Sequence, residues 1–388
     1  MRVLHFVRKN TQLKASFIQN QIINHIDFNP VVVFRKKVTT NQHDGGFSND
    51  VADEIKIIDL GSDETFFEKI LFRFFKRLSS RQQLKLQEYI SQIKPDILHF
   101  HYGTDAGIYL PALRKIALPK VVSFYGYDCS VFPRRLFGYG REYLKSRVFK
   151  YSDLVLAMSP DMEKDLITAG CPSEKIRVHY YGSEVQKYYQ EHDYSQNPVC
   201  RFLIISGLVP KKGHIFLLKA FSAALQTNQN ISLTIVGSGP VEQEIVNYVI
   251  EYKLKEKVTF PGPVVYGSNE HHDYFKTHDV FIHSSIRDVN GDKEGIPGAI
   301  VEAMAAGLPV ASTFHAGIPY IIENEKTGLL VREWDIPALA DAIIRLSGSS
   351  ESRKKLGVAG QEYALNHLDL KNKEKELEEI YNSLIDQH

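Results

Sequence analysis

The fold is decided by the stretch Glu294-Gly-Ile-Pro-Gly-Ala-Ile-Val-Glu302 and its continuation Ala303-Met-Ala-Ala-Gly307-Leu-Pro-Val310. A Gly/Pro turn lies between two carboxylates, and an apolar helical pattern then ends at Gly307 before a new apolar run. Pro297 suits the first turn of a helix, where its missing N–H costs no hydrogen bond. The stretch therefore predicts a turn, a helix and a strand, the repeating unit of an α/β domain.

The same turn has the features of an anion site. The N–H groups of a helix N-terminus, here those of Gly298, Ala299 and Ile300, lack partners within the helix and attract anions. Glu302 lies just inside the helix, where a carboxylate can accept bonds from both hydroxyls of a ribose. Glu294 precedes the turn, on the far side of the anion. The pattern predicts a nucleotide-sugar site, lined between the carboxylates by Gly295, Ile296, Pro297, Gly298, Ala299 and Ile300.

Bulk properties indicate a globular enzyme. A length of 388 residues suits two domains of roughly 150–200 residues. No apolar run approaches the ~20 residues that span a bilayer, and the first residues read as a strand followed by polar residues rather than as a signal peptide. The three cysteines match neither a disulfide framework nor a zinc site. We therefore expect a cytoplasmic protein.

Charge is distributed unequally along the chain. Residues 1–190 hold 28 Lys and Arg against 20 Asp and Glu, a net +8, whereas residues 191–388 hold 19 against 26, a net −7. Such a split suggests two domains with different partners. The basic half suits an anionic membrane surface or a pyrophosphate-linked acceptor. Nucleic acid is not expected, since no motif that reads it appears.

Apolar runs alternate with helical patterns, which predicts two doubly wound α/β domains with parallel sheets and ligands at the carboxyl ends of the strands. The polar segment 189–198 is typical of a linker, and the segment 371–388 is typical of a helix. The expected strands lie near residues 2–7, 30–34, 55–60, 96–101, 120–125, 153–158 and 175–180, then 201–205, 231–236, 257–260, 279–283, 309–313 and 328–332.

Short motifs follow one another in a characteristic order: Ser16-Phe-Ile-Gln-Asn-Gln21, His99-Phe-His101-Tyr-Gly103, Ser123-Phe-Tyr-Gly126-Tyr-Asp128, Lys211-Lys-Gly213, Gly237-Ser-Gly-Pro240 and the block 294–330. Their order resembles the retaining glycosyltransferases of family 4, with Glu294 and Glu302 as the Glu-x7-Glu signature. The chain is most similar to the branch that builds bacterial exopolysaccharide, as in colanic acid and amylovoran synthesis.

The resemblance implies the GT-B fold, in which two Rossmann-like doubly wound domains face each other across a cleft. Residues 1–190 would form the acceptor-side domain and residues 191–365 the nucleotide-sugar-binding domain. The C-terminal helix, within residues 366–388, would cross back to the first domain.

The resemblance also implies roles for the donor-side residues. Glu294 would hold hydroxyls of the donor sugar and Glu302 the ribose, while Lys212, in the turn that ends at Gly213, would meet the diphosphate. The base would lie near Pro263, and whether it is uracil or guanine stays open. The family normally has Arg at the position of Gly207, so a phosphate-binding guanidinium is missing or is supplied from elsewhere, with Arg287 as one candidate.

The first domain departs from the family pattern. Tyr125 replaces a His that reaches the donor sugar in many relatives; a phenol can hydrogen-bond a hydroxyl but cannot act as a base at neutral pH. His101, at the end of the strand 96–101, either faces the cleft or is a core histidine with satisfied hydrogen bonds. Asp128 orients the acceptor or caps a turn, and we favour the functional role.

Metal chemistry is not expected. The chain has no Asp-x-Asp, the usual carboxylate pair for a nucleotide-sugar cation. Residues 270–272 with His278 do not make a zinc site, because adjacent histidines point to different helix faces and no cysteine is nearby; a surface helix is favoured. We expect no cofactor beyond the donor itself.

We therefore predict a metal-independent retaining hexosyltransferase of cell-surface polysaccharide or lipopolysaccharide synthesis. It would use a UDP- or GDP-sugar and a glycan or polyprenyl-pyrophosphate-linked acceptor. Without a dedicated nucleophile, the chemistry would be same-face displacement. Two alternatives stay open: a nucleotide-sugar epimerase of the same fold, and a degenerate, non-catalytic nucleotide-binding protein, against which the intact Glu pair argues.

Two basic and apolar segments predict peripheral binding to the inner face of the plasma membrane through the first domain. Thr65–Leu78 has a helical apolar stripe beside Lys and Arg; packing of this stripe against the sheet is favoured over membrane contact. Residues 131–141, which include Arg134 and Arg135, mix aromatic and cationic side chains in an expected loop.

Overall fold

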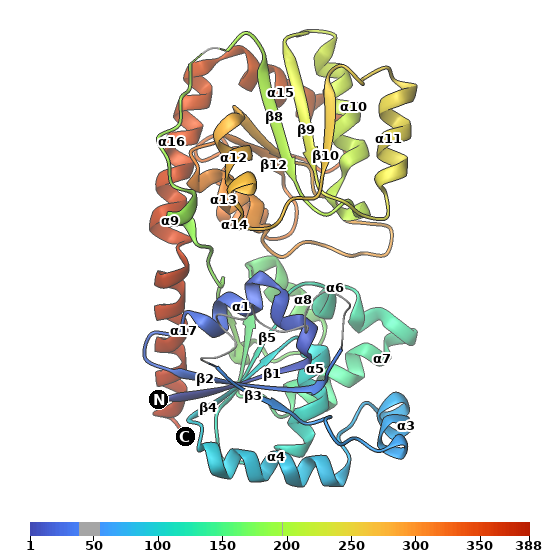
Figure 1. Cartoon of the computed structure of the whole chain (residues 1–388), viewed down its shortest axis with the longest axis vertical. Coiled ribbons are helices and arrows are strands. Elements are labelled where there is room, and N and C mark those ends of the chain that lie inside the picture. Colours follow the sequence, from blue (N-terminus) through green and yellow to red (C-terminus); the bar gives the residue numbers. More distant parts are fainter. Residues whose placement is uncertain (39–54, 196) are drawn as a thin grey trace. The chain divides into compact units, whose positions relative to one another are not determined.

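The computed structural model describes residues 1–38, 55–195 and 197–388, so residue 196 of the expected linker lies outside the described residues. The chain divides into two compact units (Figure 1): Met1–Tyr181 together with Leu370–His388, and Gly182–Asp369. The boundaries thus fall at 181/182 and 369/370, where the sequence suggested 190/191 and 365/366.

The first unit is built on a seven-stranded parallel sheet with the order β3-β2-β1-β4-β5-β6-β7. Strands β1, β2, β4, β5 and β6 are apolar runs that are largely buried on both faces, as expected for a parallel sheet that helices cover, whereas the edge strands β3 and β7 are partly exposed. All seven coincide with predicted strands: β1 (Arg2–Lys9), β2 (Asn29–Lys36), β3 (Lys56–Asp59), β4 (Ile97–His101), β5 (Lys120–Ser123), β6 (Leu154–Ala157) and β7 (Ile176–Val178).

The helices of the first unit include α17, which packs on this sheet although it ends the chain. Leu377, Ile380 and Tyr381 of α17 form one apolar cluster with Val3 and Ile97 of the strands, as the family resemblance implied. The α-helices are α1 (Ser16–Ile23), α3 (Phe66–Phe75), α4 (Ser80–Ile93), α5 (Gly103–Tyr109), α6 (Tyr127–Ser130), α7 (Arg135–Leu144), α8 (Pro160–Thr168) and α17 (Leu370–Ile385). Shorter turns are η1 (Asn10–Lys14), η2 (Leu110–Ala112), η3 (Phe132–Arg134), η4 (Lys145–Phe149) and η5 (Ser173–Lys175).

The second unit repeats the plan with a six-stranded parallel sheet of order β10-β9-β8-β11-β12-β13. Its strands again match the prediction: β8 (Cys200–Ile205), β9 (Ile231–Val236), β10 (Val258–Gly262), β11 (Val280–His283), β12 (Val310–Thr313) and β13 (Leu329–Val331). Its helices are α9 (Val185–Tyr188), η6 (Pro210–Lys212), α10 (His214–Leu225), α11 (Glu242–Glu251), α12 (Asn269–Thr277), α13 (Gly298–Ala305), α14 (Ile318–Ile321), α15 (Ile336–Gly348) and α16 (Ser350–His367).

In each sheet the strand order reverses once, between β1 and β4 in the first unit and between β8 and β11 in the second. In a doubly wound sheet, loops that leave the carboxyl ends of two such strands diverge to opposite faces and leave a crevice for ligands. The loops after these four strands are therefore the positions where functional side chains are expected.

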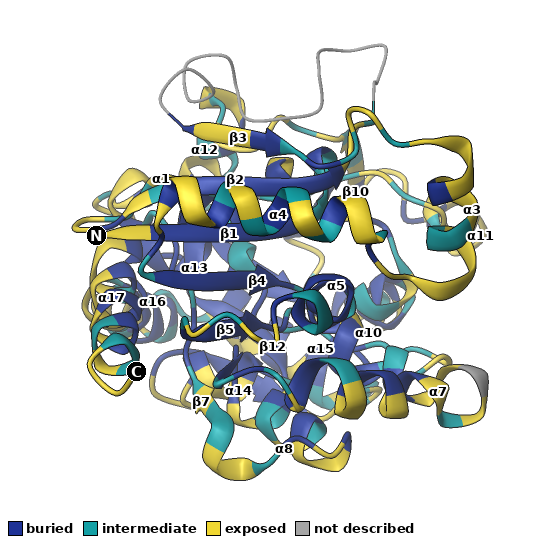
Figure 2. Ribbon diagram, turned by 90° about the horizontal axis from the view of Figure 1, so that it is seen from below, coloured by how far each residue is buried: buried dark blue, intermediate teal, exposed yellow. Residues whose placement is uncertain are grey.

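Two predictions about the first unit were wrong. Most of the apolar stripe of 65–78 does not pack against the sheet, because Phe66, Phe67 and Phe74 of α3 are 79%, 67% and 74% exposed, whereas Leu78 at its end is buried in the core. Figure 2 shows α3 largely in the colour of exposed residues. The segment 131–141 is not a loop, since it forms η3 and most of α7.

Candidate functional site

The loops after β8 and β11 bring together two residues that the sequence singled out. Nζ of Lys212, at the end of η6, lies 3.0 Å from Oε1 of Glu294. Both side chains are largely buried, 15% and 10% exposed. The pair lies at the switch point of the second sheet, where the geometry of the fold places a ligand.

Glu294 is held in its ionised form. Burial alone would raise its pKa, but the ammonium groups of Lys212 and Lys211 outweigh burial and hold the pKa below its ordinary value. Lys211 has a carboxylate partner of its own, Asp292, at 3.2 Å. The site thus contains two neighbouring ion pairs, Lys212–Glu294 and Lys211–Asp292.

Two histidines that the sequence analysis missed complete this site. Nε2 of His283 lies 3.5 Å from Nζ of Lys212, and burial lowers the pKa of His283 well below 6.5, so the ring is neutral. Nε2 of His315 accepts the N–H of Glu294 at 3.1 Å, while Nδ1 of His315 lies 2.7 Å from Glu333. His283 ends β11 and His315 follows β12. A histidine at the carboxyl end of a predicted parallel strand could have been recognised in the sequence as a candidate site residue.

Two glycines of the β8 loop differ in their surroundings. Gly213 has a φ of +66°, and a Cβ on it would lie 2.1 Å from the carbonyl oxygen of Ser284, so only glycine fits. At Gly207 an added Cβ would meet no atom within 4 Å among the described residues. The position where relatives have Arg is therefore open.

The predicted helix after Glu294 is α13, with Pro297 as the residue before its first turn. The N–H of Ile300 donates to the carbonyl of Pro297 at 3.1 Å, so it is not free, contrary to the expectation. The N–H groups of Gly298 and Ala299 remain available to an anion in this first turn. Gly295 and Ile296 pack against Gly317, where a Cβ would lie 2.3 Å from the Gly295 carbonyl.

The carboxylate of Glu302, which the sequence assigned to the ribose, is buried. It is 3% exposed, and burial raises its pKa to about 7 in spite of a hydrogen bond from Tyr266. Nε2 of His271 lies 3.8 Å from its carboxylate. The expectation that residues 270–272 lie on the surface was therefore wrong for His271, which is buried and faces Glu302.

Pro263, expected near the base, lies in the exposed loop that follows β10. This loop adjoins the glycine turn after β9, because the N–H of Gly237 donates to the carbonyl of Gly262 at 2.9 Å. Both loops leave the carboxyl edge of the sheet that also carries Lys212 and Glu294. The predicted donor-side residues therefore gather at one edge of the second unit.

In the first unit, His101 and Tyr125 form a hydrogen-bonded pair. Nδ1 of His101 lies 2.6 Å from the hydroxyl of Tyr125, which donates to Gln21 at 3.0 Å. His101 is fully buried, and burial lowers its pKa to about 3, so it is a neutral core histidine rather than a charged side chain exposed to a ligand.

This pair ends a longer buried network. Nε2 of His101 lies 3.0 Å from His5, whose other nitrogen lies 2.9 Å from His25. Burial would lower the pKa of His25, but Glu374 and Glu378 of α17 raise it to about 8. The network therefore fixes one positive charge at α17 and leaves the inner rings neutral.

Two groups of side chains in this network have the spacing of metal ligands. The ligand atoms of each group lie within 4.8 Å of one another: His5, His99 and His101, and His25, Glu374 and Glu378. His5, His25 and His101 already bond one another, and His99 bonds Ser123 at 2.7 Å. A metal ion would have to replace such bonds.

Asp128 supports the backbone beside the network. Its carboxylate accepts the N–H groups of Gly103, Tyr125 and Gly126 at 2.8, 3.1 and 3.2 Å. It is fully buried, which raises its pKa to about 6. In this position Asp128 ties the loops after β4 and β5 together, the turn-capping alternative that the sequence left open.

Comparison with known protein families gives a match in each half of the chain. Residues 38–187 match the model described as Glycosyltransferase Family 4, and residues 197–363 match the model described as Glycosyl transferases group 1. The two matches together span most of the chain.

Relatives and solved structures agree with this assignment. The chain is 33% identical over 253 residues to the amylovoran biosynthesis glycosyltransferase AmsK of Erwinia amylovora, covering 65% of this chain and 60% of AmsK. It is 31% identical over 258 residues to the putative colanic acid biosynthesis glycosyltransferase WcaL of Escherichia coli, covering 66% and 62%. Less than two thirds of either relative is thus matched.

The crystal structure of HepE from Anabaena in complex with UDP superposes with a TM-score of 0.78 at 17% identity, covering 99% of this chain and 100% of HepE. At this identity the likeness shows the fold, which is GT-B as predicted.

Proposed function

Because the chain belongs to the glycosyltransferases of family 4, we propose that it transfers a hexose from a UDP- or GDP-sugar to an acceptor in exopolysaccharide synthesis, with retention of the anomeric configuration. The observation that carries the proposal is the buried ion pair between Lys212 and Glu294 at the switch point of the second sheet. A doubly wound domain binds nucleotides at such a point.

In this proposal the donor exchanges partners with the pair. The diphosphate forms an ion pair with the ammonium of Lys212, and the backbone N–H groups of Gly298 and Ala299 donate to its other oxygens. Glu294 then accepts hydrogen bonds from hydroxyls of the donor sugar, and Glu302 accepts those of the ribose. The charged groups that pair with each other in this structure would then become contacts of the donor.

The proposed reaction is a same-face displacement. The bond between the anomeric carbon and the diphosphate oxygen breaks with its electron pair on the oxygen, while the acceptor oxygen bonds to the same face of that carbon. The acceptor proton passes to the departing diphosphate. Lys212 stabilises the charge that develops there; two unit charges ~4 Å apart gain ~4 kcal/mol at an effective dielectric constant of ~20. No metal takes part in this scheme.

The first unit would receive the acceptor, a glycan free or linked to a lipid. Tyr125 offers a hydroxyl held by His101 and Gln21, and Asp128 positions the loop that carries Tyr125. His101 and Asp128 thus act through Tyr125 rather than on the acceptor directly.

The proposed place of work is the inner face of the plasma membrane. Among the described residues no helix is both long and apolar enough to cross a bilayer. Peripheral contact is supported by the exposed phenylalanines of α3, a helix that also carries Lys69 and Arg73, and by the exposed Phe137 of α7.

The test is a panel of UDP- and GDP-hexoses incubated with the purified protein. Slow release of free hexose and nucleoside diphosphate, reduced in Lys212→Ala and Glu294→Gln, is the expected result. Conversion of the donor into its epimer, with no free hexose, would instead identify an epimerase. Weak or absent nucleotide binding with no turnover of any donor would identify a degenerate, non-catalytic protein.

A further inference from the structure

Residues 287–294 belong to the loop that leads from β11 to α13, and both ends of this segment are held at backbone N–H groups. The N–H of Arg287 donates to Oε2 of Glu333 at 2.8 Å, and the N–H of Glu294 donates to Nε2 of His315 at 3.1 Å. Nδ1 of His315 lies 2.7 Å from Oε1 of Glu333. One bonded pair of side chains, which we call the His–Glu clamp, therefore holds both ends of the segment.

The hydrogen bonds of the clamp have one direction. A ring nitrogen that accepts an N–H carries no proton, so Nδ1 of His315 carries the proton and donates to Glu333. Burial alone would raise the pKa of Glu333, but hydrogen bonds from His315 and from the N–H of Arg287 hold it below its ordinary value. The ionised carboxylate thus fixes the ring, and the ring fixes the backbone of Glu294.

The clamp is built on adjacent strands of the second sheet. His315 follows β12, and Glu333 follows β13, its neighbour in the sheet. The N–H of Phe314 donates to the carbonyl of Val331 at 2.8 Å, and the N–H of Ile318 donates to the carbonyl of His315 at 2.9 Å. The hydrogen bonds of the sheet and of the helix α14 therefore set the position of the histidine.

The interior of the segment is tied locally. Oδ1 of Asp288 accepts the N–H groups of Asn290 and Asp292, each at 2.8 Å. Asp292 is also ion-paired with Lys211 at 3.2 Å. With the interior fixed in this way, the bonds at the two ends decide where the segment delivers Glu294.

The backbone of Glu294 determines what its carboxylate can reach. Oε1 lies 3.0 Å from Nζ of Lys212, so a turn of the peptide would carry the carboxylate away from this contact. The loop that carries His315 also packs directly against the next residue, since a Cβ on Gly317 would lie 2.3 Å from the carbonyl oxygen of Gly295. A side chain that recognises a ligand by hydrogen bonds has to be placed within about 0.5 Å of the productive geometry.

We propose that His315 and Glu333 are positioning residues for the donor sugar. They hold the backbone of Glu294 so that its carboxylate meets the hydroxyls of the sugar, and they act through Glu294 rather than on the sugar. This role rests on the proposed transfer reaction, in which Glu294 binds the sugar. The effect of the clamp on the segment 287–294 does not depend on that reaction.

The first test is hydrogen exchange of the full-length protein, measured by mass spectrometry on peptides that cover residues 287–294. His315→Ala removes the acceptor of the Glu294 N–H, so exchange in this segment should become roughly tenfold faster, the effect of losing one hydrogen bond. His315→Gln has an amide oxygen that can accept the same N–H, and it should exchange nearly as slowly as the wild type. Unchanged exchange in His315→Ala would overturn the clamp.

The second test separates the sugar from the nucleotide, with UDP-glucose and GDP-mannose as donors and UDP and GDP as free nucleotides. His315→Ala should lower kcat/KM for donor hydrolysis roughly tenfold to a hundredfold and change free-nucleotide affinity less than about twofold, because only the sugar contact is misplaced. His315→Gln should recover most of the lost activity. A purely structural role predicts equal losses of hydrolysis and nucleotide affinity, and that result would overturn the assignment.

Variants of Glu333 test whether the two residues act together. Glu333→Gln keeps an acceptor for the N–H groups of Arg287 and His315 and should be close to the wild type, whereas Glu333→Ala should reproduce part of the loss. His315→Ala with Glu333→Ala should lose no more activity than His315→Ala alone, because both act through one contact. If His315→Ala does not fold, Glu333→Ala carries the same comparison, since its side chain is less buried, at 29% against 1% exposed.

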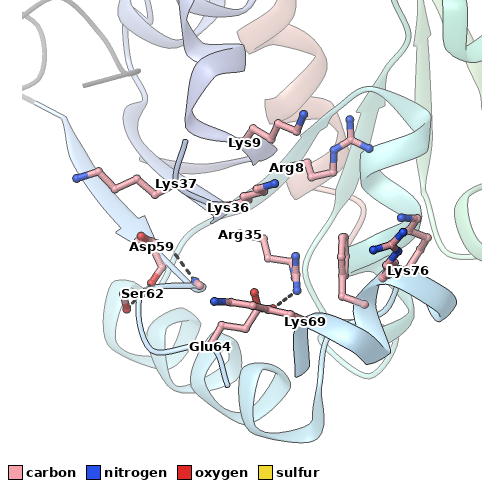
Figure 3. Close-up of a pocket in the computed structure, with 13 residues that line it drawn as sticks. Arg8, Lys9, Arg35, Lys36, Lys37, Asp59, Ser62, Glu64, Lys69 and Lys76 are labelled. Atoms are coloured by element: carbon pink, nitrogen blue, oxygen red, sulfur yellow. Dashed lines mark hydrogen bonds and ion pairs between the residues drawn. The ribbon is translucent and has the colours of Figure 1, made fainter. Parts of the chain in front are cut away.

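Two control variants remove comparable buried groups outside the donor site. His278 is a buried histidine at the amino end of β11, with its ring nitrogens 2.8 Å from the carbonyl of Tyr274 and 2.9 Å from the hydroxyl of Thr234. In the first unit, Glu64 is ion-paired with Arg35 at a cavity of about 900 Å³ (Figure 3). His278→Ala and Glu64→Ala should lower the Tm but leave exchange at 287–294 and donor hydrolysis as in the wild type. Losses equal to those of His315→Ala would overturn the assignment.

The two tests distinguish failure of the clamp from failure of the proposed reaction. If the wild type hydrolyses neither donor nor any other UDP- or GDP-hexose, the proposed transfer reaction is refuted, and exchange at 287–294 still decides whether the clamp holds the segment. If the wild type hydrolyses a donor and His315→Ala does so equally well, only the positioning role is refuted.

Discussion

The ammonium of Lys212 lies 3.0 Å from the carboxylate of Glu294, although the two residues belong to different loops of the second sheet. The contact joins the loop after β8 to the loop after β11 across the switch point. Removing one member of a buried pair leaves the other charge uncompensated. A substitution at either residue therefore also changes the electrostatic surroundings of the other. The effect of such a substitution must be measured on ligand binding as well as on activity.

The two carboxylates of the signature should have separable roles. Glu302→Ala should weaken binding of UDP or GDP by roughly 1–3 kcal/mol, because it removes hydrogen bonds to a charged acceptor. Glu294→Gln should leave nucleotide affinity nearly unchanged and strongly lower transfer, because its partner is the sugar. Titration calorimetry gives the affinities, and thermal unfolding verifies that both variants fold. Wild-type nucleotide affinity in Glu302→Ala would disprove the ribose assignment.

Nucleotide binding should depend on pH through Glu302. Burial raises the pKa of its carboxyl to about 7, and ribose hydroxyls that donate to it favour the ionised form, so binding releases a proton. Affinity should therefore be full above this pKa and fall as the pH decreases through it, by up to about tenfold per pH unit. Calorimetry across this range tests the prediction, and Glu302→Gln should remove the dependence. A flat wild-type profile would contradict it.

Gly207 offers a gain-of-function test. An added Cβ meets no described atom within 4 Å, so Gly207→Arg should be tolerated and should supply the guanidinium that relatives place near the diphosphate. We expect UDP or GDP to bind about tenfold more tightly, the effect of one added charge-assisted hydrogen bond. Gly207→Ala is the neutral control. Gly213→Ala should instead destabilise the fold, because its Cβ would lie 2.1 Å from the Ser284 carbonyl. Unchanged affinity in Gly207→Arg would place the diphosphate elsewhere.

Transfer should not require a metal ion and should retain the anomeric configuration. Lys212 and the N-terminus of α13 supply the positive field that a cation provides in other sites. Activity should persist in excess EDTA, and NMR of the first-formed product should show the anomer of the donor. Loss of activity on chelation with recovery on adding manganese would refute the scheme, and an inverted product would refute the same-face displacement.

The sheets were predictable because each buried parallel strand is a short apolar run between polar loops, as at Val31–Phe34. The position of Lys212 and Glu294 at one edge of the second sheet was predictable, because the turn before Gly213 and the spacing of Glu294 from Glu302 follow the family resemblance. Their roles in donor binding stay predictions. The orientation of α3 was not, since an apolar stripe has the same period whether it faces a sheet or solvent. The His5–His25–His101 network was not predictable either, because its members are distant in sequence and meet only through strand order.

Membrane contact through the first unit can be tested by flotation with anionic liposomes. Phe66 and Phe74 of α3 and Phe137 of α7 are 79%, 74% and 110% exposed. Insertion of these phenylalanines into the lipid, together with attraction between nearby cations and anionic headgroups, should bind the protein to the membrane surface. Each Lys or Arg near the surface adds only about 1 kcal/mol and is screened by salt. We therefore expect binding at low salt that is lost at high salt and weakened by Arg134→Glu with Arg135→Glu, whose side chains are exposed.

Substituting Phe66 and Phe74 by Ser should reduce binding at both salt concentrations, because the apolar contribution is not screened. The charge-matched Arg114→Glu with Lys115→Glu variant should float as the wild type does, since binding depends on where the cations lie and not on their total number. If the wild-type protein does not float with anionic liposomes even at low salt, the exposed face of α3 does not contact lipid. The acceptor would then have to reach the first unit from solution.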